Sequence, residues 1–353
     1  MITVLGLALY GPLAASNRYR LSQYVTGLAA YGIDLQISHL LGDDYLRYRF
    51  GNGSIPVDAI FSAGIDRLTK LLRKQEYDIA MVHCELFPLL PAWIECSLIR
   101  RPYIYDFDDA FYLKYHSGLM GVARPLLGRK FERVIAGAAA VTAGNRVLAN
   151  YALQFNTKTH LFPSVVDTGR YLSRPAGHHG KVFTVGWIGS PSTAPFLMEL
   201  VGPLSVIGKE SPIRFIVIGG KAPVVPNVTV VEMEWNEHTE IDLINSFDVG
   251  VMPLPVDDWA RGKCAFKLIQ YMACGVPVIA SPVGANSDVI TDDCGLMAST
   301  PEEWVNRLRI MRDDPKKRAE MGKAGRLRVE AHYSLDTNLP VLARLIRNVV
   351  DEK

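Results

Sequence analysis

A chain of 353 residues is long enough for two domains of ordinary size, each with its own core. Its hydrophobic content of 49% and charged content of 21% are typical of a globular protein and exclude a disordered one. The formal net charge of +2 is too small for a protein that binds nucleic acid through a basic surface, so we expect no nucleic-acid partner.

The cysteines and the apolar runs indicate the cellular environment of the protein and whether it crosses a membrane. The five cysteines are odd in number and scattered, and neither they nor the histidines show the spacing of metal ligands. We therefore expect a reduced, cytoplasmic protein without a metal centre. No apolar run reaches the roughly 18 residues that a membrane span requires. Residues 1–10 are apolar but lack a basic segment, which favours a first strand over a signal peptide.

The first third of the chain alternates apolar runs with helical segments. Apolar runs predict strands at residues 2–9, 32–41 and 77–82. Residues 65–72 predict a helix. Residues 46–55 mix basic and aromatic residues and predict a loop. No G-x-G-x-x-G follows the first strand, so the fingerprint of a dinucleotide site is absent.

Polar residues follow two of these strands at the point where each strand ends. Asn17, Arg18 and Arg20 come after the first strand, and His83 ends the third. Ligands of open α/β sheets bind at the carboxyl ends of the strands, so these four residues are candidates for a cleft. A surface arginine and a structural histidine are the alternative interpretations.

A dense group of carboxylates follows the strand predicted at residues 102–105. Asp106, Asp108 and Asp109 stand within four residues, in the segment DFDDAFY. Carboxylates this close are costly to pack unless a ligand or a cation uses them. The group predicts an active-site loop, a cap for the following helix, or an Asp-x-Asp pair that holds a divalent ion on a diphosphate.

Residues 119–138 combine apolar residues with four basic ones, Arg124, Arg129, Lys130 and Arg133. They predict either a packed helix, interrupted by Pro125 and Gly128, or an amphipathic helix that lies against an anionic membrane surface.

The second half of the chain repeats the alternation of strands and helices. Further strands are predicted at residues 139–143, 159–162, 182–188, 213–218 and 228–233. The turn-rich segment 173–181 predicts an interdomain linker. After the strand at 182–188, Gly189 and Ser190 begin a turn of small and hydroxyl-bearing residues, which suits a phosphate group.

The longest ordered pattern runs from residue 248 to residue 295. An apolar run at 249–254 gives way to a polar loop, a helix ends at Gly275, and a second apolar run follows at 276–280. This order predicts a parallel strand–helix–strand unit with a polar loop over its carboxyl end.

Three cations lie in this loop and helix: Arg261, Lys263 and Lys267. If both lysines are helical, their spacing of four puts them on one face. Cations near the N-terminus of a helix suit a diphosphate. A solvated basic helix face is the alternative.

This pattern, in which a lysine-bearing helix ends YMACGVPVIAS and PVGANSDVI follows, resembles the donor-binding half of retaining GT-B glycosyltransferases. More narrowly it is similar to the family 4 group that builds bacterial surface polysaccharides. The resemblance implies an α/β fold of two Rossmann-like, doubly wound domains that face each other across a cleft. The N-terminal acceptor-side domain would comprise residues 1–170, with the helix at 337–353 returning to it, and residues 181–336 would bind a nucleotide sugar.

The resemblance also assigns roles to residues. Donor binding falls to Gly189, Ser190, Arg261, Lys263, Lys267 and Gln270. Asp106, Asp108 and Asp109 become the catalytic candidates on the acceptor side. The donor is a nucleoside-diphosphate sugar that serves as co-substrate, with no cofactor and no metal. A divalent ion on Asp106 and Asp108 would instead indicate a GT-A enzyme, which the C-terminal half disfavours.

The sequence departs from this family at two places. Many relatives carry an arginine and a lysine just after the strand at residues 182–188, and this chain has neither. The family often has two glutamates where Gly262 and Gln270 stand here. The Gln270 amide can still bond a ribose hydroxyl, whereas Gly262 cannot replace a carboxylate.

The resulting expectation is a retaining glycosyltransferase of the hexosyltransferase type. It would move a sugar from a nucleoside diphosphate to a hydroxyl of a glycan or lipid-linked acceptor in polysaccharide biosynthesis. We expect it in the cytoplasm, with peripheral contact at the inner face of the membrane. A nucleotide-sugar epimerase on the same fold, and a non-catalytic glycan-binding or partner subunit, are the alternatives.

Overall fold

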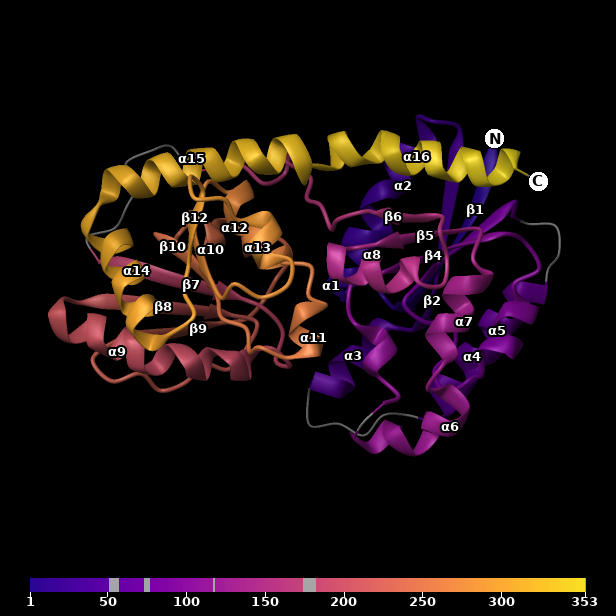
Figure 1. The fold of residues 1–353 in the computed structure, drawn as a ribbon, viewed down its shortest axis with the longest axis horizontal. Helices are drawn as coiled ribbons and strands as arrows, with labels where there is room; N and C mark the ends of the chain where they lie inside the picture. The colour runs from indigo at the N-terminus through magenta and orange to yellow at the C-terminus, as the bar shows by residue number, and fades with distance from the viewer. Residues whose placement is uncertain (51–56, 73–76, 117, 174–181, 353) are drawn as a thin grey trace. The chain divides into compact units, whose positions relative to one another are not determined.

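The structure is a computed structural model that describes residues 1–50, 57–72, 77–116, 118–173 and 182–352. The chain divides into a first unit (residues 1–164, 262–264 and 335–353) and a second unit (residues 165–261 and 265–334). Each unit is built around its own six-stranded sheet (Figure 1). The expected α/β class is therefore confirmed. The linker predicted at 173–181 lies, apart from Ser173, outside the described residues.

The sheet of the first unit is parallel throughout, with strand order β2-β1-β3-β4-β5-β6. Its strands are β1 (Ile2–Tyr10), β2 (Ile33–Leu41), β3 (Ile79–His83), β4 (Tyr103–Phe107), β5 (Ala140–Ala143) and β6 (Thr159–Leu161). The chain order reverses at β1, which has β2 on one side and β3 on the other. Such a reversal is the topological switch point at which open α/β sheets bind ligands.

Helices connect the strands of the first unit. The α-helices are α1 (Ala15–Arg20), α2 (Val25–Ala29), α3 (Asp43–Phe50), α4 (Val57–Leu72), α5 (Ala92–Leu98), α6 (Arg124–Leu127), α7 (Lys130–Gly137), α8 (Arg146–Leu153) and α16 (Leu335–Asp351). Short 3-10 turns are η1 (Ser22–Tyr24), η2 (Phe111–Leu113) and η3 (Gly118–Ala123). The last helix, α16, packs on α2, η1 and β3 of this unit.

Two predictions for the first unit need comment. The prediction of a loop at 46–55 is wrong for residues 46–50, which belong to α3; residues 51–55 lie outside the described part of the chain. Asp43 and Asp44 are favourably placed in the first turn of this helix. The segment 119–138 is not one helix but η3, α6 and α7, and α6 ends at Leu127, just before Gly128. A Cβ at Gly128 would lie 2.7 Å from the Arg124 carbonyl oxygen. Helix α7 buries Phe131, Val134 and Ile135, as the packed-helix interpretation expects.

The sheet of the second unit has the order β12-β11-β10-β7-β8-β9, again parallel throughout. Its strands are β7 (Phe183–Ile188), β8 (Ile213–Ile218), β9 (Thr229–Met233), β10 (Val249–Met252), β11 (Val278–Ala280) and β12 (Gly295–Met297). Numbered within the unit, this is the 3-2-1-4-5-6 order of the Rossmann fold. Its switch point lies between β7 and β10.

The helices of the second unit are α9 (Val201–Glu210), α10 (Glu240–Ile244), α11 (Asp258–Arg261), α12 (Phe266–Ala273), α13 (Asn286–Val289), α14 (Pro301–Asp313) and α15 (Pro315–His332), with the 3-10 turn η4 (Ala194–Leu200). Helix α14 begins with a capping box between Thr300 and Glu303. Across the described part of the chain, no helix combines the length and the apolar composition needed to cross a bilayer.

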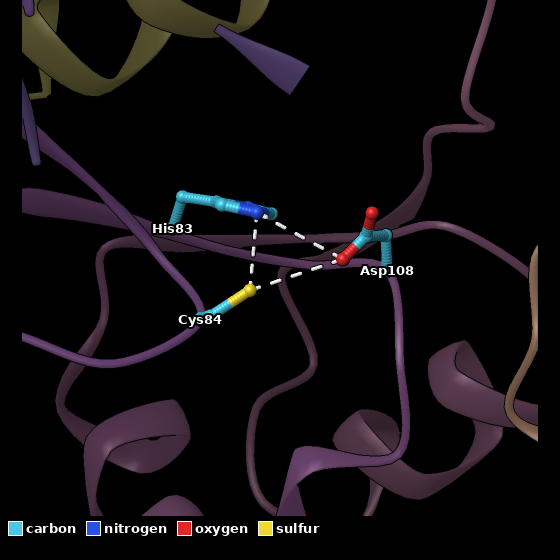
Figure 2. A group of neighbouring side chains, drawn as sticks. All are labelled: His83, Cys84 and Asp108. Atoms are coloured by element: carbon cyan, nitrogen blue, oxygen red, sulfur yellow. Dashed lines mark hydrogen bonds and ion pairs between the residues drawn. The ribbon is translucent and has the colours of Figure 1, made fainter. Parts of the chain in front are cut away.

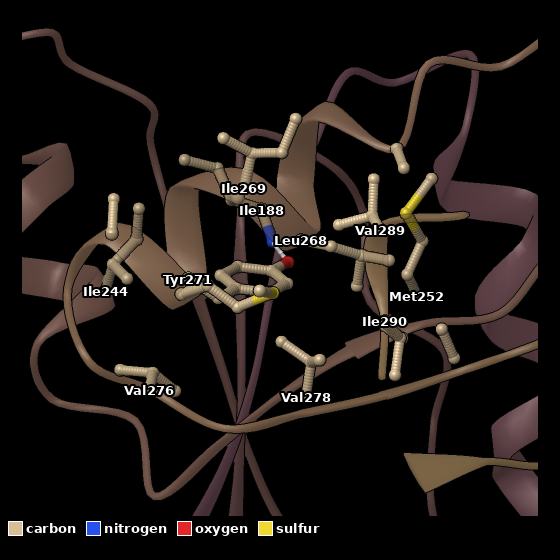
Figure 3. Close-up of a cluster of buried hydrophobic side chains, with 14 of the residues drawn as sticks. Ile188, Ile244, Met252, Leu268, Ile269, Tyr271, Val276, Val278, Val289 and Ile290 are labelled. Carbon is tan, nitrogen blue, oxygen red and sulfur yellow. Dashed lines mark hydrogen bonds between the residues drawn. The ribbon is translucent and has the colours of Figure 1, made fainter. Parts of the chain in front are cut away.

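Apolar residues cover both faces of the second sheet, because successive side chains of each buried strand point to opposite faces. Val185 and Trp187 of β7 belong to a core cluster with α9 and α14, whereas Ile188 belongs to a second cluster with α12. Figure 3 shows this second cluster around Tyr271, whose hydroxyl accepts a 2.9 Å hydrogen bond from the Ile188 backbone N–H. This bond fixes α12 against the end of β7, where the predicted phosphate turn starts.

Candidate functional site

The carboxyl edge of the second sheet brings together two segments that are far apart in the sequence. The loop after β7 starts at Gly189, and α12 follows the neighbouring strand β10. Lys267, the second residue of α12, reaches back to this loop, so that its Nζ lies 3.4 Å from Thr193 Oγ1. The same ammonium group lies 5.2 Å from the centre of the Trp187 ring. A cation is thereby held next to a hydroxyl-bearing loop at the switch point.

Glycine at position 189 makes room for this lysine. A Cβ at Gly189 would lie 2.4 Å from the Trp187 ring and 2.7 Å from Lys267 Cε. In the same loop Ser190 Oγ and Ser192 Oγ are 2.8 Å apart. Gly189, Ser190 and Lys267, all predicted from the sequence, therefore line one place. A lysine with serine and threonine hydroxyls is a suitable set of donors for a phosphate group.

The neighbouring loop after β8 is equally crowded. Gly219 has φ +76°, a conformation that favours glycine, and a Cβ there would lie 2.5 Å from the Gly189 carbonyl oxygen. A Cβ at Gly220 would lie 2.9 Å from the Trp187 ring. Glycine is therefore needed at both positions, because a Cβ would collide with the Gly189 backbone or with the Trp187 ring.

Gln270 lies one turn further along α12 and is buried. Its Nε2 donates a 2.8 Å hydrogen bond to the Tyr171 hydroxyl, which donates one of the same length to Glu240. Trp235 Nε1 donates to the other oxygen of that carboxylate. The predicted ribose contact of Gln270 therefore starts from an amide whose orientation is fixed by a buried network.

The two other predicted cations are not on the face of α12 that carries Lys267. Ala265 has a left-handed φ of 54° and separates Lys263 from the helix, so the two lysines do not share a helical face. Lys263 groups with the first unit, where its Nζ lies 2.8 Å from an oxygen of Asp109. Arg261 ends α11, is exposed, and lies 3.8 Å from Asp258.

In the first unit, Asp106 is the centre of a buried hydrogen-bond network at the end of β4. Arg20 donates to both carboxylate oxygens, at 3.0 Å from Nε to Oδ2 and more closely from Nη2 to Oδ1. Thr142 Oγ1 donates at 2.6 Å, and His83 Nδ1 lies 2.7 Å from Oδ2. Burial alone would raise the pKa of Asp106, but the charge of Arg20 and the His83 hydrogen bond hold that pKa well below its usual range.

This network gives Arg20 and Asp106 a structural function. Both side chains are fully buried, and Arg20 also donates to the Phe162 carbonyl oxygen at 2.7 Å. Arg20 is thus not a surface arginine, and the carboxylate of Asp106 is saturated with donors. Of the three aspartates, Asp108 and Asp109 keep some exposure, 18% and 26% of their side chains.

Two further cleft candidates serve the turn after β1. Asn17 is buried and donates to the Tyr10 carbonyl oxygen at 2.6 Å. Arg18 donates at 2.8 Å to the carbonyl oxygens of Pro12 and Leu13. These contacts shape the loop at the switch point of the first sheet.

His83 lies beside Cys84, a residue that is not among the site candidates predicted from the sequence. Its Sγ lies 3.0 Å from His83 Nε2 and 3.8 Å from Asp108 Oδ1, as Figure 2 shows. Cys84 has φ 64°, a left-handed conformation that costs a non-glycine residue about 1–2 kcal/mol. Burial raises the pKa of the Cys84 thiol, and the charge of Asp108 raises it further.

The partners of these residues differ in how far the sequence reveals them. Trp187 and Thr193 lie in or next to the predicted strand and turn, so local pattern points to them. Tyr171 and Glu240 are 69 positions apart and carry no local signal. Only the fold brings them to Gln270.

Known structures of other proteins superimpose on nearly the whole chain. Sucrose-phosphate synthase from Thermosynechococcus elongatus superimposes with a TM-score of 0.72 at 16% identity, over 100% of both chains. Anabaena HepE, solved in complex with UDP and glucose, superimposes with a TM-score of 0.68 at 15% identity, over 99% of this chain and 100% of that one. The chain has the GT-B fold.

Sequence comparison matches this chain to glycosyltransferases. A family model described as glycosyl transferase-like matches residues 204–343, the part of this GT-B chain that contains α12. A GDP-mannose-dependent mannosyltransferase from Corynebacterium glutamicum, which acts on a monoacylated phosphatidylinositol monomannoside, is 41% identical over 68 residues. That segment covers 19% of this chain and 18% of the relative.

Proposed function

We propose that the protein is a retaining glycosyltransferase of family 4 that uses a nucleoside-diphosphate sugar. The observation that carries the proposal is the position of Lys267, 3.4 Å from Thr193 Oγ1 and beside Gly189, at the switch point of the second sheet. Rossmann-like sheets bind nucleotides at this place. The glycosyl transferase-like match covers this lysine, and HepE, of the same fold, was solved with UDP.

Lys267 would act on the leaving group. As the bond from the sugar to the diphosphate breaks, negative charge develops on the diphosphate oxygens, and a cation fixed beforehand stabilises it. Ser190 and Thr193 would add hydroxyl donors, while Gly189 keeps the approach open. Such fixed charges are usually the largest single contribution to catalysis.

Arg261 would supply further positive charge to the diphosphate, and we therefore expect no metal ion there; Lys263 instead pairs with Asp109 within the first unit. Gln270 would donate to a ribose hydroxyl. Gly262 offers no side chain to the sugar, and this departure leaves the contacts of the sugar hydroxyls to other residues. We therefore propose the class of donor and leave its sugar and base to measurement.

On the acceptor side the proposal rests on Asp108 and Asp109. Asp106 is buried under Arg20, His83 and Thr142, which suits a residue that positions its neighbours. Asp108 is partly exposed at the carboxyl edge of the first sheet and could orient an acceptor hydroxyl. The acceptor would be a glycan or lipid-linked sugar in polysaccharide biosynthesis, met in the cytoplasm at the inner face of the membrane.

The test is release of nucleoside diphosphate from a panel of UDP-, GDP-, dTDP- and ADP-hexoses, each with magnesium and with EDTA. Binding is read separately as a shift of the melting temperature against a donor-free sample in the same buffer. A ligand at about 100 times its Kd stabilises by about 2.7 kcal/mol. We expect one base to shift the melt equally with magnesium and EDTA, and release to depend on an added glycan or lipid-linked acceptor.

Other outcomes decide between the alternatives. Conversion of the donor sugar without acceptor would indicate an epimerase. Binding without release, under every acceptor tried, would favour a non-catalytic subunit. A melt shift that requires magnesium would contradict metal-free binding of the diphosphate. The anomeric configuration of the product, read by NMR, tests retention.

A further inference from the structure

The carboxyl edge of the first sheet holds three potential metal ligands that the proposed reaction does not need together. His83 Nε2, Cys84 Sγ and one Asp108 oxygen lie within 4.8 Å of one another. Figure 2 shows the three side chains pointing toward a common point between them. We propose that this group is a site for one zinc ion, held by imidazole, thiolate and carboxylate.

The backbone is built to gather these side chains. Neighbouring residues of a strand point to opposite faces, so His83 and Cys84 would diverge if β3 continued. The left-handed φ of 64° at Cys84 turns its side chain back beside His83. This conformation is clamped from both sides, because the Cys84 N–H donates to the Asp106 carbonyl oxygen at 2.8 Å and its own carbonyl accepts from the Tyr105 hydroxyl at 2.7 Å.

A carboxylate behind the histidine fixes which nitrogen is available. His83 Nδ1 lies 2.7 Å from Asp106 Oδ2 and donates to it, which leaves the lone pair on Nε2 directed at Cys84 and Asp108. Metal-binding histidines commonly donate their other ring N–H to a carboxylate in this manner. Asp106 is itself held by Arg20 and Thr142, so the imidazole cannot rotate freely. Asp106 is in this sense a positioning residue.

The spacing and the ligand types suit zinc. Zinc bonds of about 2.0–2.3 Å at tetrahedral angles put ligand atoms about 3.3–3.6 Å apart. The observed separations are 3.0 Å from Nε2 to Sγ, 3.8 Å from Sγ to Oδ1 and 3.8 Å from Nε2 to Oδ1. A small shift of the partly exposed Asp108 would bring both of its separations into this range, and Nε2 and Sγ would have to move apart by a few tenths of an ångström when the ion binds. Magnesium and calcium prefer oxygen ligands alone, whereas thiolate and imidazole favour zinc.

Charge and access are consistent with an ion that has one open position. A thiolate and a carboxylate neutralise a divalent cation, and the charge of Asp106 is already matched by Arg20. His83 and Cys84 are about 2% exposed, whereas the Asp108 side chain is 18% exposed, so solvent reaches the group from the side of Asp108. Three protein ligands and an open fourth position are the arrangement of reactive rather than purely structural zinc sites, and water or a hydroxyl group would fill it.

The experiment uses the full chain, stripped with a chelator and desalted, and contains no donor or acceptor, so its result is independent of the proposed transferase activity. Zinc is titrated against a chromophoric chelator, and cobalt is added separately to detect its thiolate charge-transfer absorption. We expect one zinc per chain and a cobalt–thiolate band. Cys84→Ser should abolish the band and weaken zinc binding at least 100-fold, whereas Asp108→Asn should weaken binding and keep the band.

Cys96→Ser is the matched control, since Cys96 is a free cysteine of the same unit and contacts Tyr103 instead. It should bind zinc like the unaltered protein. If Cys84→Ser does not fold, Asp108→Asn and the zinc-dependent rise in melting temperature decide. The proposal is overturned if stoichiometric zinc does not bind, if cobalt gives no thiolate band, or if Cys96→Ser removes binding as completely as Cys84→Ser.

Discussion

Each unit has a doubly wound parallel sheet, but different side chains lie at the carboxyl edges of the two sheets. The second unit offers a lysine, hydroxyls and bare glycine backbone around Gly189. The first unit offers a saturated aspartate, a histidine and a cysteine packed around Asp106. At the edge of the second sheet a cation lies beside hydroxyl groups, whereas at the edge of the first sheet the polar groups bond to one another. A doubly wound parallel sheet therefore specifies a place for chemistry without specifying the chemistry.

The largest expected effect is the loss of the buried charge in the first unit. Asp106→Asn keeps the size of the side chain but leaves the buried guanidinium of Arg20 without its counter-ion. Breaking such a pair typically costs about 3–5 kcal/mol. Urea unfolding measures the free energy of unfolding. Asp44→Asn, which removes the exposed pair with Arg47 and one charge from the first turn of α3, should change it by at most about 1 kcal/mol. Equal losses in the two variants would contradict the comparison.

The same carboxylate should make stability depend on pH. The pKa of Asp106 lies well below its usual range in the folded state, against about 3.9 in the unfolded chain. A depressed pKa contributes stability that is present above about pH 4 and is lost as the pH falls toward the folded value. The difference in free energy of unfolding between the unaltered protein and Asp106→Asn should therefore shrink as the pH falls below about 4. A difference that is unchanged at pH 3 would argue against this assignment.

In the second unit the largest effect should fall on turnover instead of stability. Lys267→Ala removes the cation from the switch point and should lower kcat about 10²–10³-fold, as loss of one stabilising charge or donor does elsewhere. Nucleoside-diphosphate release measures it, and circular dichroism checks the fold. Lys316→Ala, at an exposed lysine of α15, is the control and should leave the rate unchanged. Normal turnover by Lys267→Ala would remove the main support for the proposed function.

Gly189→Ala tests whether the open backbone matters as much as the charge. The added methyl group would meet the Trp187 ring and displace Lys267, and a displacement of about 1 Å can cost about 10²-fold in rate. Gly202→Ala in α9 is the matched control, because a Cβ there has no neighbour within 4 Å. The steady-state rates of the two variants are compared. Similar rates would mean that the turn has no part in donor binding.

The smallest effect is expected from Tyr171→Phe. The hydroxyl links Gln270 to Glu240, and its removal leaves two buried polar groups short of a partner, at a cost of about 1–3 kcal/mol. Chemical unfolding of this variant is compared with Tyr48→Phe, whose side chain is exposed. No difference between the two would show that the network contributes little. A fall in donor affinity along with stability would connect Gln270 with the ribose.

Much of this architecture is readable from local pattern. Apolar runs between helical segments predict most strands, and the segment 248–295 predicts the strand–helix–strand unit that carries Lys267. Gly189 and Ser190 follow a strand, and local pattern is enough to mark them. These predictions depend on side chains close together in the chain, where the periods of helix and strand leave a direct trace.

From the chain's local patterns we predict the fold class, the parallel sheets and the candidate residues at the strand ends. Which of these candidates lie together depends on the folded chain: Lys267 lies beside Thr193, Lys263 does not share its helical face, and Asp106 is saturated by Arg20. The fold also places Cys84 beside His83, because Cys84 has a left-handed backbone conformation that the apolar pattern of the strand does not predict. The reason is physical. Burial, charge pairing and ligand geometry are set by residues distant in sequence, and periodicity carries no information about them.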